Sequence, residues 1–244
     1  MEGRTAYWRA RVLVRLGRAP EAVEAYASLW SEGPLTYYGQ LSLARLGELD
    51  SARAAALRAR LPRLPQTSEG QYFEDRPLFH RPGFRRVLAL AQLGESEMLH
   101  SELKALSLLK GGQEEELDWL VVSLYNAASD HTRAIRTWRR RLDGMLRSMP
   151  EVSAFARWQL AYPLAYRPLL DGVARDAGVP ASFVRAVARE ESSFDPRAVS
   201  GARAYGLVQI IRPTARGIAK SLGLPSTAAA LRTPRINLRI GTRF

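Results

Sequence analysis

Apolar residues recur every three to four positions along most of the chain, a spacing that places them on one face of an α-helix. The clearest case comes early, where YWRARVLVRLGRAPEAVEAY from Tyr7 and YYGQLSLARLGELDSARAAA from Tyr37 match at an offset of thirty positions. In both copies a Leu-Gly pair, ending at Gly17 and Gly47, follows the first apolar face. Glycine readily adopts the left-handed conformation that ends a helix, so each copy predicts helix, stop and helix.

A looser copy ends at Gly94 and continues into ESEMLHSELKALSLL. Self-similarity at this period is typical of a helical solenoid, in which each pair of helices buries its apolar face against its neighbours. Residues 1–150 are therefore predicted to form a TPR-like helical-repeat superhelix. Four prolines between 61 and 82 predict a connector, and further helices are predicted within 114–128 and 132–146.

A second domain is predicted over residues 151–244, where proline and glycine mark the helices. A helix over 166–177 is predicted to end at Gly178, and Pro180 to open the helix that carries AREES. Pro213 and Pro234 take the same first-turn place in two later helices. No stretch alternates convincingly between apolar and polar residues with period two, so the predicted fold class is all-α.

The composition narrows the possible partners. The formal net charge of +12 and the pI of about 10.6 favour polyanions, namely nucleic acid, an anionic lipid surface or an acidic cell-wall polymer. No run approaches the roughly 18 apolar residues needed to span a membrane, and the arginine-containing N-terminus does not resemble a signal peptide. With no cysteine and three histidines far apart in the sequence, no metal site is predicted, and no cofactor is implied.

Candidate chemistry lies in AREESSF, where two glutamates end an apolar helix. On a helical wheel Glu191 falls between Val184 and Val187, within an apolar face formed by Phe183, Val184, Val187 and Phe194. Glu190 falls nearer the opposite edge of that face. An apolar wall favours the protonated form of a carboxylic acid, which can then donate a proton to the leaving oxygen of a glycosidic bond. For a glutamate pair taken alone, exposure of both at a helix end is the commoner outcome.

The segment ESSFDPRAVSGARAYGLVQIIRPTA, with NLRIGTRF after it, resembles the signature of the soluble lytic murein transglycosylases, and the helical repeats resemble that family's superhelix. The matching positions are Glu191-Ser192, Phe194, Pro196, Ser200, Ala204, Gly206-Leu207, Gln209, Thr214-Ala215, Asn237 and Gly241. The chain departs from the pattern with Arg203 for a glycine, Val208 for a methionine and Pro213 one place late. The resemblance implies a lysozyme-like α domain after the superhelix.

By the same resemblance the protein is an enzyme, a periplasmic peptidoglycan lytic transglycosylase whose partner is the glycan strand. Glu191 is implied to be the single acid/base that breaks the β-1,4 bond between MurNAc and GlcNAc and forms 1,6-anhydro-MurNAc. The residues implied to contact the substrate are Ser200, Tyr205, Gly206 and Gln209. For Tyr205, simple packing in the loop is an equal expectation, and Asp195 is expected to cap the chain or face solvent.

The family continues with further helices beyond the point where this sequence stops. We therefore expect the chain to be a fragment, truncated within its catalytic domain and with little or no activity by itself. Three other readings stay open. They are a muramidase that uses water on the same scaffold, a non-catalytic helical-repeat binding module, and charge-driven nucleic-acid binding, which has no motif behind it.

Overall fold

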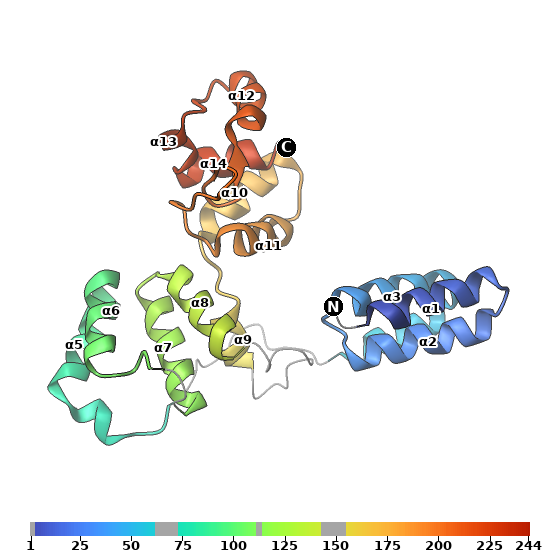
Figure 1. Ribbon diagram of the computed structural model, residues 1–244, viewed down its shortest axis with the longest axis horizontal. Coiled ribbons are helices and arrows are strands. Elements are labelled where there is room, and N and C mark those ends of the chain that lie inside the picture. The colour runs from blue at the N-terminus through green and yellow to red at the C-terminus, as the bar shows by residue number, and fades with distance from the viewer. Residues whose placement is uncertain (1–2, 62–72, 111–113, 143–154) are drawn as a thin grey trace. The chain divides into compact units, whose positions relative to one another are not determined.

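The computed structural model describes residues 3–61, 73–110, 114–142 and 155–244, and the chain packs into two compact units. One unit comprises Met1–Gln71 with Leu142–Trp158, and the other comprises Tyr72–Arg141 with Gln159–Phe244. The regular structure is almost entirely helical (Figure 1), which confirms the predicted fold class. The domain boundary predicted near position 150 lies outside the described residues.

The two matched sequence copies fold as consecutive helices of the first unit. They are α1 (Arg4–Arg15), α2 (Ala19–Glu32), α3 (Tyr37–Leu49) and α4 (Ser51–Ala59). Each helix packs against the next, and α1, α2 and α3 lie side by side in Figure 1. Tyr7, Tyr26 and Trp30 are buried at the centre, with alanines of α1, α2 and α4 packed among them. The small residues thus let the helices of a pair approach closely.

The glycines of the repeats do not all end helices. Gly17 has a φ of 73° and separates α1 from α2 as predicted, and Gly94, with a φ of 75°, ends a helix of the second unit in the same way. The predicted stop at Gly47 is wrong, because this residue lies inside α3. Asp50 makes the break instead, since its carboxylate caps α4 by accepting a hydrogen bond from the Arg53 N–H at 2.8 Å.

The second unit begins, within the described residues, with a 3-10 helix at Pro77–His80 in the predicted connector. Its later elements are α5 (Pro82–Leu93), α6 (Ser96–Ala105), α7 (Glu115–Ala127), α8 (His131–Arg141), α10 (Arg167–Ala177), α11 (Ala181–Ser192), β1 (Ala204–Tyr205), β2 (Ile210–Ile211), α12 (Arg212–Ser221), α13 (Ala228–Leu231) and α14 (Pro234–Gly241). A further helix, α9 (Phe155–Ala161), runs across the change of unit. The short strands, α9 and α13 were not predicted.

One core joins α8 to the helices that follow it. Ile135 of α8 is buried in a cluster with Leu170 of α10, Val184 of α11 and Leu238 of α14. A neighbouring cluster packs Tyr205 and its strand partner against α12, α13 and α14. Within the described ranges, every helix is too short or too polar to cross a lipid bilayer.

Candidate active site

The helix α11 carries both candidate glutamates in its last turn. Pro180 precedes its first residue, and the chain reverses directly after its last, because Ser193 and Phe194 adopt left-handed conformations with φ of 53° and 62°. Phe194 then turns into the core, where it is 3% exposed. Because the chain reverses here, the buried ring of Phe194 packs close to the end of α11 and fixes the position of the last turn, which carries Glu191.

The two glutamates have different surroundings. Glu190 accepts a hydrogen bond from Arg139 of α8 at 2.6 Å, so its carboxylate is held in an ion pair. Glu191 is exposed and has no hydrogen bond or ion pair to any described residue. The prediction that an apolar wall surrounds Glu191 is wrong for the described residues, because the side chain is exposed. Val184 and Ala188 on the same side are buried, but Phe183 is 63% exposed and Glu191, one turn after Ala188, is itself exposed.

Ser192 ties the end of α11 to a short hairpin. Its hydroxyl oxygen lies 2.8 Å from the Leu207 carbonyl and 3.0 Å from the Ala188 carbonyl of its own helix. Leu207 lies in the loop between β1 and β2, which pair antiparallel with Tyr205 opposite Ile210. Glu191 is therefore the immediate neighbour of the residue that joins the helix to the hairpin.

The hairpin loop from 206 to 209 contains two of the predicted substrate-binding residues. Gly206 has a φ of 76°, and a Cβ there would lie 2.3 Å from the Leu231 carbonyl oxygen, so only glycine fits. Gln209 donates from Nε2 to the Gly206 carbonyl at 2.8 Å and the Ala198 carbonyl at 3.3 Å. Its side-chain oxygen has no partner among the described residues and can accept a hydrogen bond from a ligand.

The other two predicted contact residues mainly support the hairpin. Ser200 is exposed, and its hydroxyl oxygen accepts a hydrogen bond from the Ala204 N–H at 3.1 Å. Tyr205 is 9% exposed and belongs to the core around α12 and α14, with the Arg232 guanidinium 5.8 Å from its ring centre. Asp195 accepts from the Arg197 N–H at 2.9 Å, which confirms the capping role expected for it.

Asn237 of α14 holds the loop from beneath. Its side chain is 1% exposed, accepts a hydrogen bond from the Val208 N–H at 2.9 Å, and donates to the Tyr205 and Leu231 carbonyls at 2.8 and 2.9 Å. The sequence signature included Asn237 but gave no hint of this role. The sequence feature that could have indicated a buried hydrogen-bonding role is the position of this polar residue between the apolar Ile236 and Leu238.

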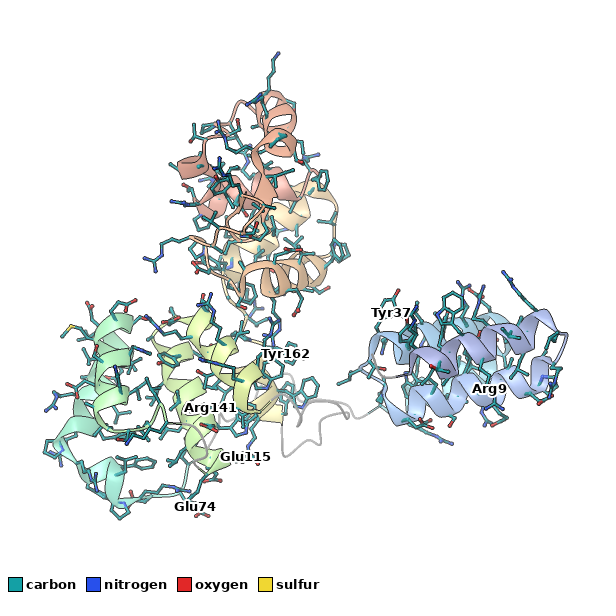
Figure 2. The ribbon with its side chains drawn as sticks, in the orientation of Figure 1. Arg9, Tyr37, Glu74, Glu115, Arg141 and Tyr162 are labelled. Carbon is teal, nitrogen blue, oxygen red and sulfur yellow. The ribbon has the colours of Figure 1, made fainter. Side chains whose placement is uncertain are left out.

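Arg189 attaches the same helix end to α8. Its guanidinium lies 4.2 Å from the ring centre of Tyr162 and 4.9 Å from that of Trp138, and it donates to the Ala161 carbonyl at 2.6 Å. Arg189 is only 6% exposed, so these contacts replace its hydration. Figure 2 labels Tyr162 at the approach of α8 to α11. This anchoring residue, two positions before Glu191, was missed by the sequence reasoning.

The arrangement is a carboxylic acid at a fixed helix end beside a hydrogen-bonding loop. Such a site can move a proton to or from a bound ligand. Across the described residues no group of three or more His, Asp or Glu side chains is placed to hold a metal ion.

Comparison with known proteins gives a consistent result. Residues 169–244 match the family model described as Transglycosylase SLT domain. The soluble lytic murein transglycosylase of Escherichia coli K12 is 25% identical over 240 residues, which is 98% of this chain and 33% of that protein. Membrane-bound lytic murein transglycosylase C of Yersinia enterocolitica is 38% identical over 82 residues, covering 32% of this chain and 23% of the relative.

Solved structures share the fold. The 70 kDa soluble lytic transglycosylase of Escherichia coli superimposes with a TM-score of 0.62 at 24% identity, over 98% of this chain and 34% of that one. An inactive mutant of the lytic transglycosylase Slt of Pseudomonas aeruginosa gives 0.59 at 21% identity, over 100% and 41%. The match to the curated Escherichia coli relative includes nearly all of this chain, but the chain spans only about a third of that relative's length. The chain is thus similar to soluble lytic murein transglycosylases over nearly its whole length, and residues 169–244 carry the match to the SLT domain.

Proposed function

We propose that this chain is part of a peptidoglycan lytic transglycosylase that cleaves the β-1,4 bond between MurNAc and GlcNAc. The observation that carries the proposal is the environment of Glu191, an unpaired carboxyl group at the fixed end of α11, next to the serine that joins the helix to the hairpin loop. Glu190 is unsuited to the role because Arg139 occupies its carboxylate. The names of the relatives supply the substrate class, and a wall polymer as substrate supports a periplasmic location for the protein.

In the proposed reaction, protonated Glu191 donates its proton to the glycosidic oxygen as the bond from that oxygen to the muramoyl C1 breaks. The C6 hydroxyl of the same sugar attacks C1, and its proton passes to the Glu191 carboxylate. The product is a 1,6-anhydro sugar and no water is consumed. One carboxyl group suffices because the nucleophile is already attached to the substrate.

The hairpin loop supplies the proposed substrate contacts. The free side-chain oxygen of Gln209 can accept from a sugar hydroxyl or an acetamido N–H, and Gly206 lets the chain follow the turn that presents it. Ser200 can still donate its hydroxyl proton to a ligand, since its oxygen serves as the acceptor for Ala204. The buried ring of Tyr205 contributes to this surface through the loop that it supports.

A pair of variants tests the assignment in the product of the complete gene. Glu191→Gln should abolish the release of anhydro-muropeptides from purified peptidoglycan, because an amide cannot donate the required proton. Glu190→Gln should retain most activity, because its exposed ion pair contributes about 0–1 kcal/mol. Activity in the Glu191 variant, or equal loss in both, would contradict the assignment. A reducing-end product in place of the anhydro sugar would identify a muramidase.

A further inference from the structure

The basic residues of the chain are unevenly distributed. Residues 196–244 contain nine arginines and lysines and no aspartate or glutamate. The first 195 residues contain the other 27 basic residues together with all 24 acidic ones, which nearly cancel. The net charge of +12 therefore comes mainly from the last 49 residues, which lie entirely within the segment that matches the SLT domain.

These nine cations have no acidic partner within the part of the chain that the structure describes. None of them forms an ion pair with a described residue. Arg243 donates to the backbone carbonyl of Asp176 at 3.1 Å, and Arg232 lies over the ring of Tyr205. Arginines elsewhere are often paired, as Arg18 is with Glu21. A folded segment that concentrates cations without counter-charges attracts anions from outside.

Six of the nine cations form two stripes along helices. Arg212, Arg216 and Lys220 follow one another at intervals of four residues on α12, and all three are exposed. Arg235, Arg239 and Arg243 repeat this spacing on α14 and two residues beyond its end. Four residues along a helix advance about 6 Å, so neighbouring cations lie on one side and repel each other. A bound anion removes that repulsion.

The character of the surface restricts the partner. Membrane-docking helices place exposed apolar side chains beside their cations. On α12 itself Ala215, Ile218 and Ala219 pack toward the core, and a single exposed aliphatic side chain, Ile211 at 39%, directly precedes the helix. Surfaces for single-stranded nucleic acid combine cations with exposed aromatic platforms, whereas α12 contains no aromatic residue. Of the two aromatic residues in this segment, Tyr205 is buried and the exposed Phe244 lies beyond the end of α14. An acidic polymer bound through charge alone fits these features best.

We propose that the α12 stripe, Arg212, Arg216 and Lys220, binds carboxylate groups on the peptides attached to the wall glycan. The inference rests on the proposed function, because peptidoglycan is the polymer that the domain would handle. The stripe would select strands whose peptides keep free carboxylates. It lies directly after β2 of the hairpin that carries Gln209, so strand capture and the candidate site belong to one folded segment.

Binding of the chain to insoluble peptidoglycan, measured by co-sedimentation at low and high salt, tests the proposal. Two forms of the polymer are compared, one native and one with its carboxylates converted to amides, which removes the charge and keeps the sugars. The triple variant Arg212→Gln, Arg216→Gln, Lys220→Gln is compared with Arg4→Gln, Arg9→Gln, Arg15→Gln. The control removes the same charge from α1, where all three residues are exposed. Glutamine keeps helix propensity, and circular dichroism checks folding.

The α12 variant should bind native peptidoglycan about tenfold more weakly than the unchanged chain, while the α1 variant changes by less than about twofold. Amidation or high salt should bring the unchanged chain down to the α12 variant's level. An equal loss of binding in the α12 and α1 variants would show that binding depends only on net charge, and would overturn the proposal. Indifference to amidation would do the same, as would tighter binding to polyphosphate or anionic vesicles than to the native polymer. Glu191→Gln in the product of the complete gene separates the two proposals, because it should remove lysis and leave binding to peptidoglycan unchanged.

Discussion

Replacing Asn237 with leucine tests how the loop that carries Gln209 is held. Leucine is similar in size but can make none of the three side-chain hydrogen bonds that Asn237 makes to the backbone of Val208, Tyr205 and Leu231. Two of the bonds are buried and the third is partly buried. At about 1–1.5 kcal/mol for each of the three lost bonds, the unfolding free energy of this unit should fall by roughly 3–4.5 kcal/mol.

Hydrogen exchange reports the change at the loop itself. The Val208 amide loses its only acceptor among the described residues, so its exchange should accelerate toward the rate of an open amide. Urea unfolding of the same variant measures the loss of stability. Thr242→Val is the matched control, because Thr242 makes a single side-chain hydrogen bond within the last turn of the same helix and should cost about 1 kcal/mol or less.

Unchanged protection of the Val208 amide would refute the reasoning, whatever the loss of stability. So would a stability loss no larger than that of the Thr242 control, because Asn237 would then be one ordinary helix residue. A large stability loss with rapid exchange confined to the loop is the expected pattern.

Three further substitutions probe the same unit. Gly206→Ala should destabilise by about 3 kcal/mol or more in urea unfolding because its Cβ would meet a backbone oxygen, whereas Gly178→Ala, with a similar φ of 71° and open space, should cost about 1 kcal/mol. Arg189→Leu should lower the unfolding free energy by about 2–4 kcal/mol, whereas Arg139→Leu should lower it by less than about 1 kcal/mol, because only Arg189 is buried. Similar losses in the two variants would contradict the anchoring role of Arg189. Burial lowers the pKa of His131, so the unfolded chain binds its proton more readily and stability should fall as pH drops below about 6.5. His131→Gln should flatten that dependence in melts between about pH 7.5 and 5.5, and an unchanged slope would count against it.

Much of the helical pattern was predictable from local residue chemistry. The positions of Gly17, Gly94 and Gly178 mark real helix ends, because a left-handed residue after an apolar run is a local requirement that the sequence displays directly. Gly47 failed as a stop signal because the following aspartate offered a better cap one turn later. The two-residue strands are too short to produce an alternating pattern.

The site was less predictable, because its side chains are placed by contacts between distant segments. The wheel located Glu191 on the Val184 side of α11, but exposure depends on how far the packing around Val184 extends along the helix. Arg189 looks in the sequence like one more surface arginine. It is buried because Tyr162 and Trp138 come from two other segments and enclose it. No periodicity of α11 itself contains that information.

The core shared by α8 and α11 also affects how the protein can be divided. Ile135 and Trp138 lie before position 143 in the sequence, yet they pack against residues that follow position 155. A recombinant piece that starts after α8 would expose Leu170 and Val184 on one side and leave Arg189 without one of its two rings. A fusion of the SLT segment to another helical array would therefore have to include α8, because the two form one folding unit.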